Sequence, residues 1–363
     1  MSKILFISAH APTEKYPQAG QKIAFNHLQQ YLTSSAIDVI VIANQIEIDA
    51  AEDLRQKCNN HLYTYPIHKL NKISSCLLHP NTPLKFATRK QPQVLHKLQQ
   101  LLATNTYEII HFEYSHAAVY LDFIQTQINP NLTQTVISIH DIVTQSFLRK
   151  AATNPLLGIE VARIFRYEQS IYSTANHLWV LSKKDRDILT SLFSIPEAKI
   201  TIKPPQLSNF VYQVKRHQEI EAKSLLFWAA MNRSENEEAI VTFVKECFQK
   251  LLEYDPQYKL YIVGSNPSQK VQKLASSHII VTGFVEDPTP FFEKAAIGIV
   301  PLLRGAGIKL KTLEMLEAGL PVISTSVGAE GIDLAVNKLV VSDDFGEWVK
   351  LILESSQLSV VST

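Results

Sequence analysis

Cysteine is scarce in this sequence, and neither sign of charge is in excess. The three cysteines, Cys58, Cys76 and Cys247, have no metal-ligand spacing, and an odd, sparse set argues against a disulfide framework and favours a reducing compartment. The 35 basic and 34 acidic residues leave a formal net charge of +1, without the strong positive charge typical of nucleic-acid binders. We therefore expect no nucleic-acid partner, and any acidic ligand must be bound by local groups.

Long hydrophobic runs are also missing. The apolar run at residues 4–7 is soon followed by His10 and Pro12, so it is too short for the core of a signal peptide. No stretch approaches the roughly 20 apolar residues that a membrane-spanning helix requires. These absences predict a cytoplasmic protein in which any membrane attachment is peripheral.

What the sequence does contain is a regular alternation of short apolar runs and helical patterns. At 363 residues, with 46% hydrophobic and 19% charged residues, it is typical of a globular protein with two domains. The alternation predicts βαβ units and parallel sheets that are covered on both faces. The expected strands are residues 4–8, 39–43, 109–112, 135–139 and 178–181, then 225–229, 259–263, 279–282, 297–301, 321–324 and 339–341; the expected helices include 21–32, 237–254, 268–275, 289–295 and 310–318.

A polar, charged run between the two halves predicts the domain boundary. Residues 215–219 read Lys-Arg-His-Gln-Glu, which is typical of a linker. We therefore expect an N-terminal domain at 1–208, a linker at 209–223, a second domain at 224–345 and a final helix at 346–363. A return of that helix to the N-terminal domain is one arrangement. Doubly wound sheets bind ligands at the carboxyl ends of their strands, so we expect the two domains to face each other across a functional cleft.

The most informative segment is residues 301–323. A predicted strand is followed by a loop that contains Gly305 and Gly307, and the loop leads directly into a helix. The start of a helix presents unpaired backbone amides and the positive end of its dipole, which together attract phosphate groups. The segment therefore predicts a site for a diphosphate.

Three side chains at the start of this helix fit such a site. The ammonium groups of Lys309 and Lys311 can reach phosphate oxygens from the first helical turn. Glu314, one turn further along, is placed to accept hydrogen bonds from sugar hydroxyls. The alternative is a basic, solvated helix start that follows a simple glycine turn.

This segment resembles the donor-binding signature of glycosyltransferase family four, the group 1 glycosyltransferases. Members of that family have two glutamates separated by seven residues before a Gly-x-Pro-Val strand, and here Glu314 and residues 319–322 match. Residues 324–331 are similar to the family's Ser-Thr-x-x-Gly-Ala-Glu-Gly ending. Further matching blocks at 227–236, 261–264 and 281–287 follow in the expected order. The resemblance implies an α/β protein with the GT-B fold, in which two Rossmann-like doubly wound domains face each other.

The sequence departs from the family pattern in two places. Ala306 stands where the first glutamate of the pair would be, and the loop after the domain's first strand, where relatives commonly carry an Arg and a Lys, reads Ala-Ala-Met-Asn-Arg-Ser-Glu-Asn at 229–236. We expect Lys309, Lys311 and Arg233 to neutralise the phosphates instead. The resemblance implies that the donor is contacted by Gly20, Arg233, Phe284, Val285, Gly307, Ile308, Lys309, Lys311 and Glu314.

In the N-terminal half the resemblance is looser. Gly20 lies in the loop after the first strand, where the family's glycine lets the backbone approach the donor, although a simple turn needs the same residue. His140 matches the family's strand-end histidine, which implies a place beside the donor sugar, and Asp141 could fix its tautomer. Glu113 also ends a predicted strand at the ligand-binding edge. For Glu113 and His140 a purely structural role is the alternative.

Two other patterns have more than one interpretation. Asp185 and Asp187 form an Asp-x-Asp sequence of the kind that can hold a divalent cation, but Ser182 predicts an N-capped helix start there, so we expect no metal site. The basic stretch 147–166 either contacts an anionic membrane surface that carries a lipid-linked acceptor or is a solvated helix pair.

The resemblance implies a retaining, metal-independent hexosyltransferase that transfers a sugar to a saccharide or lipid-linked glycan, in surface polysaccharide or glycoconjugate biosynthesis. The donor would be a nucleotide-diphosphate sugar, with UDP or GDP as the carrier, and no cofactor would be tightly bound. We expect the protein in the cytoplasm, with peripheral contact with the inner membrane face as an option. The alternatives are a catalytically degenerate GT-B protein that binds or scaffolds, and another enzyme of this architecture such as an epimerase or a phosphorylase.

Overall fold

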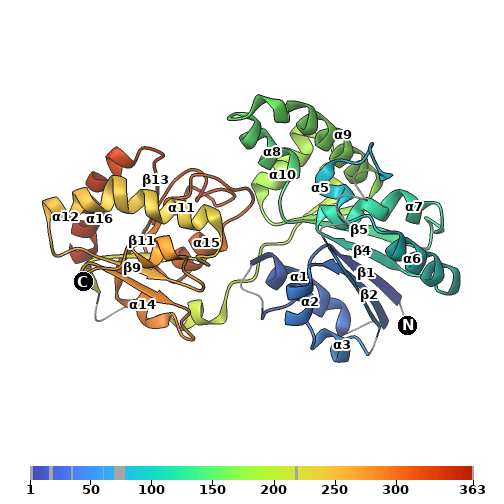
Figure 1. Ribbon diagram of the computed structural model, residues 1–363, viewed down its shortest axis with the longest axis horizontal. Coiled ribbons are helices and arrows are strands. Elements are labelled where there is room, and N and C mark those ends of the chain that lie inside the picture. Colours follow the sequence, from blue (N-terminus) through green and yellow to red (C-terminus); the bar gives the residue numbers. More distant parts are fainter. Residues whose placement is uncertain are drawn as a thin grey trace. The chain divides into compact units, whose positions relative to one another are not determined.

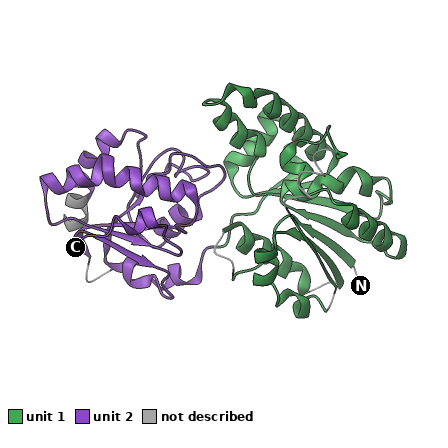
Figure 2. Cartoon of the chain, viewed as in Figure 1, with its two compact units in different colours: residues 1–206 green, residues 207–363 purple. Residues whose placement is uncertain are grey.

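The computed structural model describes residues 3–15, 19–33, 36–59, 61–68, 78–216 and 220–361, with side chains as far as residue 355. The chain forms two compact units, Met1–Gln206 and Leu207–Thr363 (Figure 2). Each unit is a parallel sheet flanked by helices (Figure 1).

The N-terminal unit is built on a seven-stranded sheet. The strands lie in the order β3-β2-β1-β4-β5-β6-β7, and neighbouring strands run parallel. The order reverses between β1 and β4, and the carboxyl ends at such a switch point are where doubly wound sheets bind ligands. The strands are β1 (Lys3–Ser8), β2 (Ala36–Ala43), β3 (Leu62–Pro66), β4 (Ile109–Glu113), β5 (Gln134–Ile139), β6 (His177–Val180) and β7 (Ile200–Ile202).

The central strands of this sheet are apolar along nearly their whole length. Five of the six residues of β1 and seven of the eight residues of β2 are buried, as expected of parallel strands that are covered on both faces. The helices are α1 (Ala19–Leu32), α2 (Gln45–Ala50), α3 (Leu54–Lys57), α5 (Leu84–Ala87), α6 (Pro92–Thr104), α7 (Leu121–Gln125), α8 (Val143–Ala151), α9 (Gly158–Thr174) and α10 (Lys183–Leu192), with 3-10 turns η1 (Ser115–Tyr120), η2 (Pro155–Leu157) and η3 (Glu197–Lys199).

The C-terminal unit repeats the scheme with six parallel strands in the order β10-β9-β8-β11-β12-β13. Its strands are β8 (Glu221–Trp228), β9 (Lys259–Val263), β10 (Ile279–Gly283), β11 (Ala295–Val300), β12 (Val322–Ser324) and β13 (Leu339–Val341). Its helices are η4 (Asn209–Gln213), α11 (Ser234–Phe243), the π-helical turn η5 (Val244–Phe248), α12 (Gln249–Tyr254), α13 (Gln269–Gln272), α14 (Thr289–Lys294), α15 (Leu310–Glu317) and α16 (Phe345–Val361). The carboxyl ends of β8 and β11 form the switch point of this sheet.

The predicted α/β architecture is confirmed, and every predicted strand is present. Bounds differ most at β8, which begins at Glu221 instead of residue 225. Two strands were not predicted. The tyrosine-containing β3 pairs with β2, and the three-residue β7 pairs with β6. Both are edge strands in which polar residues interrupt the apolar run. They can therefore be recognised as strands only from their pairing with a neighbouring strand.

The segments around the expected linker belong to the C-terminal unit. Asn209–Gln213 forms η4, and Val211 in this turn is buried. At the other end of the unit, Trp348 and Ile352 of α16 are fully buried in the core beside β8 and β11. The final helix therefore packs on the sheet of its own unit. Residues 217–219 of the charged run lie outside the described residues.

Candidate functional site

The loop between β11 and α15 forms the centre of the candidate site in the C-terminal unit. Gly305 and Gly307 both have positive φ angles, 141° and 73°, a backbone conformation that glycine adopts without strain. Lys309 occupies the N-cap of α15. The predicted sequence of strand, glycine loop and basic helix start is therefore present.

Both lysines of this helix start point back toward the loops at the switch point. Lys309 Nζ donates to the Gly307 carbonyl at 2.5 Å and lies 3.5 Å from Glu330 Oε2. Lys311 Nζ donates to Asn236 Oδ1 at 2.5 Å and lies over the ring of Phe227. The ammonium of Lys311 has no carboxylate partner among the described residues.

Burial decides the charge of Lys311. Loss of water around the ammonium, reinforced by the nearby charges of Arg233 and Lys309, lowers the pKa of Lys311 to about 7. At neutral pH a substantial share of the molecules therefore has an uncharged amine there. An anion bound beside the amine would favour the charged form.

Glu314 is held by protein donors. Its Oε1 accepts from the Ser208 hydroxyl at 2.6 Å and from the Ser208 amide at 3.3 Å, and its Oε2 accepts from Trp228 Nε1 at 2.9 Å. The side chain is 6% exposed. Oε2 keeps a lone pair for a ligand hydroxyl, but the carboxylate also fixes η4 and the end of β8, which the sequence did not indicate.

The loop after β8 contributes further polar groups. Arg233 forms an ion pair with Glu235 at 2.7 Å. Asn236 Nδ2 donates to the Ala230 carbonyl, so this side chain, which accepts from Lys311, is fixed from both ends. Asn236 was not predicted as a site residue, because an Asn in the first turn of a helix has no distinguishing pattern.

Arg304 is a second residue that the sequence analysis missed. Its Nε lies 2.5 Å from Glu238 Oε2, and its Nη2 donates to Ser234 Oγ at 3.3 Å. The guanidinium therefore connects the glycine loop to the first turns of α11. The available signal was its positive charge directly before Gly305, within a loop that is expected to bind an anion.

The remaining predicted donor contacts of the C-terminal unit lie at the carboxyl ends of its strands or in the loops beside them. Phe284 and Val285 directly follow β10, and the Phe284 side chain is 76% exposed while Val285 is partly buried. An exposed aromatic ring at this edge offers a flat surface to a nucleobase. Ile308 lies in the loop before Lys309 and is half-buried.

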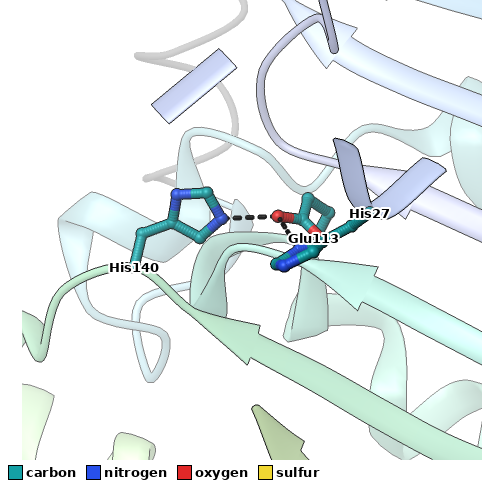
Figure 3. A group of neighbouring side chains, drawn as sticks. All are labelled: His27, Glu113 and His140. Carbon is teal, nitrogen blue, oxygen red and sulfur yellow. Dashed lines mark hydrogen bonds and ion pairs between the residues drawn. The ribbon is translucent and has the colours of Figure 1, made fainter. Parts of the chain in front are cut away.

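In the N-terminal unit the candidate site is organised by Glu113, at the end of β4. Its fully buried carboxylate contacts three imidazoles: His27 Nδ1 at 3.1 Å, His111 Nε2 at 2.7 Å and His140 Nε2 at 2.5 Å. Two of these contacts are drawn in Figure 3. Burial alone would raise the pKa of Glu113, but the surrounding histidines hold it well below its usual value. Glu113 is therefore an ionised acceptor.

This arrangement fixes the orientation of His140. Because Nε2 faces the Glu113 carboxylate, it carries a proton, and Nδ1 remains as a buried atom without a hydrogen-bond partner. The ring stacks on Tyr114 with centroids 3.9 Å apart. Among the described residues, none of the recorded hydrogen bonds joins Asp141 to His140, so the carboxylate that orients this histidine is Glu113.

Gly20 lies in the first turn of α1 and close to Tyr114. A Cβ added to Gly20 would lie 2.7 Å from the Tyr114 hydroxyl, so a side chain here would displace the tyrosine that stacks on His140. Residues 16–18, which precede this turn, lie outside the described residues.

Glu168 of α9 holds the segment that follows His140. Its carboxylate accepts from the amides of Val143 and Thr144, each at 2.8 Å, from the Thr144 hydroxyl and from the Tyr172 hydroxyl. Burial raises the pKa of Glu168 to about 7, although these donors act in the opposite direction. Glu168 thus satisfies the first amides of α8 from another helix, a role without any local sequence signal.

Ligand-type atoms of His27, Glu113 and His140 lie within 4.8 Å of one another. By residue type this set could hold a divalent cation. The nitrogen to oxygen separations of 2.5 to 3.1 Å are those of direct hydrogen bonds, and His111 donates to the same carboxylate. Elsewhere, Ser182 accepts from the Asp185 amide as the N-cap of α10, as its sequence predicts.

Comparison with known proteins identifies the class. Residues 222–356 match the family model of the glycosyl transferases group 1. The chain superimposes on Anabaena HepE in complex with UDP, with a TM-score of 0.62 at 13% identity, over 98% of this chain and 90% of that one. It also superimposes on a mutant of S. aureus TarM in complex with Fondaparinux, alpha-GlcNAc-glycerol and UDP, with a TM-score of 0.57 at 12% identity, over 99% of this chain and 94% of that one.

A relative in sequence is an uncharacterised 44.6 kDa protein in the cps region of Klebsiella pneumoniae. It is 23% identical over 379 residues, which cover 98% of this chain and 92% of that protein. Residues 222–356 therefore form a group 1 glycosyltransferase domain, and the shared architecture shows that the chain has the GT-B fold.

Proposed function

We propose that this protein transfers a sugar, with retention of anomeric configuration, from a nucleotide-diphosphate sugar to a saccharide or lipid-linked glycan. The observation that carries the proposal is Lys311, a partly buried amine with no carboxylate partner among the described residues, at a glycine loop and helix start within the matching domain. An anionic ligand beside this amine would stabilise its charged form. The diphosphate of the donor is that ligand.

The proposed chemistry needs stabilisation of the leaving group more than a strong nucleophile. Cleavage of the bond between the anomeric carbon and the phosphate oxygen leaves negative charge on the nucleoside diphosphate. Lys309, Lys311 and the amides at the start of α15 would stabilise that charge without a metal ion. The departing phosphate would accept the proton of the attacking hydroxyl, which is consistent with retention.

His140 is the proposed contact to the donor sugar in the N-terminal unit. Its unpartnered Nδ1 can accept a hydrogen bond from a sugar hydroxyl, while Glu113 holds Nε2. UDP is the preferred carrier in this proposal, because HepE was solved with UDP and with UDP-glucose. The similar protein from a cps region suggests surface polysaccharide assembly as the setting.

Thermal stabilisation by nucleotides tests the donor site. UDP, GDP, UDP-glucose and GDP-mannose would be added without metal to the wild type and to the Lys309→Ala, Lys311→Ala double variant. A ligand at a hundredfold excess over its Kd should stabilise the wild type by about 2.7 kcal/mol, and the double variant should lose this effect. Lys350→Ala, an exposed lysine of the same unit, is the matched control.

The outcomes separate the rival functions. Transfer that proceeds equally in a chelator and in added Mg²⁺ or Zn²⁺ supports a metal-independent reaction, whereas loss on chelation shows that a cation is required, for which His27, Glu113 and His140 are candidate ligands. Nucleotide binding without transfer or donor hydrolysis favours a degenerate binding protein. Absence of any nucleotide binding contradicts the proposal.

Peripheral membrane contact is a further part of this proposal. Among the described residues, no helix combines the length and the apolar character that a membrane-spanning segment requires. In the basic stretch 147–166, however, Leu156 and Ile159 at the junction of η2 and α9 are 88% and 78% exposed. Exposed apolar side chains among basic ones fit an anionic bilayer surface. Sedimentation with anionic and neutral vesicles, with Leu156→Ser as the variant, tests this contact.

A further inference from the structure

The carboxyl edge of the N-terminal sheet has a second group of polar side chains that the proposed transfer chemistry does not use. His10 follows β1, Arg89 lies between α5 and α6, and His116 lies in η1. The ring of Tyr114 connects His10 to the site at Glu113, because it stacks on His140 and lies edge-on to His10, with the His10 and Tyr114 centroids 4.8 Å apart. We call His10, Arg89 and His116 the cationic cluster, after Arg89, its charged member; burial lowers the pKa of both histidines.

Arg89 has no counter-ion of its own. Its Nη2 donates to His10 Nε2 at 3.3 Å, its Nε is buried without a hydrogen-bond partner, and none of the recorded ion pairs of the described residues includes it. The neighbouring acid, Glu47, is already bound by His10 Nδ1 at 3.0 Å and by the Ala11 amide. Loss of water around the guanidinium lowers the pKa of Arg89. A charge in this position is costly until an anion reaches it.

His116 is the second unsatisfied group. The side chain is 6% exposed, and neither ring nitrogen has a hydrogen-bond partner. Burial, together with the charges of Lys85 and Arg89, holds the pKa of His116 well below its usual value. The neutral ring therefore offers one N–H donor within the cationic cluster, and an anion beside it would raise its pKa.

The backbone around Arg89 is fixed, and the cluster is open on one side. The buried Tyr120 hydroxyl donates to the Arg89 carbonyl at 2.7 Å and accepts from the Gln91 amide at 2.8 Å. His10, by contrast, has a side chain that is 28% exposed. Arg89 is also partly exposed, so a ligand can approach a guanidinium whose backbone is already held in place, which limits the entropic cost of binding.

We propose that Arg89 and His116 bind an anionic group, a phosphate or a carboxylate, of the sugar acceptor beside His140. This inference rests on the proposed transferase function and specifies its acceptor class. Arg89 would form the ion pair through its Nε and remaining N–H groups, and His116 would donate one hydrogen bond. A neutral acceptor would leave the guanidinium, with its buried Nε, unpaired, so the site would discriminate in favour of the charged acceptor.

Binding of small probes tests the inference separately from the donor site. Glucose 6-phosphate, methyl glucuronide, inorganic phosphate and the neutral methyl glucoside would be titrated into the full chain by calorimetry, each with and without UDP. The wild type should bind an anionic sugar at least tenfold more tightly than methyl glucoside. Arg89→Gln should abolish this preference and leave the affinity for UDP within twofold. Lys97→Gln, a lysine that lies over Tyr63 in the same unit, is the control. The better of the phosphate and carboxylate probes identifies the anion.

Three results would overturn the inference. One is equal binding of neutral and anionic probes by the wild type while UDP still binds, which leaves the proposed function intact. Another is a parallel loss of UDP affinity in Arg89→Gln, which assigns the cluster to the donor diphosphate. The third applies if Arg89→Gln unfolds and cannot be tested. The pKa of His116 in the wild type would then be followed by NMR, with the His116 signal assigned by comparison with His116→Asn. The proposal requires that this pKa rise when the anionic probe is added. No rise contradicts the proposal.

Discussion

At the scale of single residues, the function of Glu113 depends on its three histidine neighbours. A carboxylate has enough lone pairs to accept from His27, His111 and His140 at once, and its ionisation fixes which nitrogen of each ring carries the proton. A glutamine of the same size keeps one acceptor oxygen and adds a donor that faces an imidazole N–H.

Glu113→Gln should therefore lower kcat while nucleotide binding remains. The loss of a buried hydrogen bond to His140 is worth about 1 to 3 kcal/mol, which corresponds to a roughly 5- to 160-fold lower rate. Steady-state kinetics and UDP calorimetry would separate the two effects, with circular dichroism to check the fold. Asp141→Asn is the control and should change kcat by less than about threefold, since its carboxylate forms no recorded hydrogen bond with His140. A larger loss in Asp141→Asn would contradict the assignment.

Lys311 predicts a pH dependence of donor binding. In the free protein burial lowers its pKa to about 7, and only the ammonium form pairs with the diphosphate. The bound diphosphate raises this pKa again, so binding takes up a proton. The association constant for UDP-glucose should therefore be nearly constant below pH 7 and fall by about tenfold per unit above it.

Calorimetry in buffers of different ionisation enthalpy would measure this proton uptake directly. Lys311→Met should bind more weakly at pH 6.5 and show a flat profile up to pH 8.5. A wild-type profile that is equally flat would show that Lys311 keeps its charge in the free protein.

At the scale of elements, the start of α8 depends on a side chain from α9. Glu168 accepts from two backbone amides and two hydroxyls at that point, and the segment leads back directly to Asp141 and His140. Removal of the carboxylate leaves buried donors without partners, which is one of the few changes that destabilises a protein by several kcal/mol.

Glu168→Ala should lower the free energy of unfolding by about 3 kcal/mol and reduce activity through the displaced His140. Urea unfolding and kinetics would test both. Glu168→Gln retains an acceptor and the side-chain volume, so its loss should be smaller. Equal stability of Glu168→Ala and the wild type would mean that water replaces the carboxylate.

At the scale of the whole molecule, two units with separate cores have separate candidate sites. The C-terminal unit contains the glycine loop, Lys311 and Asn236, whereas the N-terminal unit contains Glu113 and the cationic cluster. Ligands with different chemistry should therefore affect different units.

Amide hydrogen exchange of the full chain should reveal this division. UDP should slow exchange most in residues 301–312 and 229–236, because the diphosphate satisfies and covers the amides at the start of α15. An anionic acceptor probe should instead act on segments around residues 89 and 116. Protection by UDP that is confined to the N-terminal unit would contradict the assignment of the donor site.

The sequence alone determined the architecture and the glycine loop before α15, for which we propose donor binding. Apolar runs alternating with helical patterns can fold only as buried parallel strands with covering helices, and the glycines and lysines of the segment before α15 are local in the chain, so their spacing predicts their placement. Strand-end position likewise predicted Glu113 and His140, because the carboxyl ends of parallel strands meet at one edge.

The tertiary structure decided which residues that are distant in the sequence contact one another. Glu113 replaced Asp141 as the partner of His140, since adjacency in sequence does not make two side chains face each other. Asn236, Glu168 and Arg89 acquire their roles from residues 25 to 79 positions away, and the edge strand β3 exists only through its pairing with β2. Burial lowers the pKa of Lys311, and the packing around Arg89 places no counter-ion from the described residues beside it. Both effects depend on the packed chain, so no single segment of the sequence predicts them.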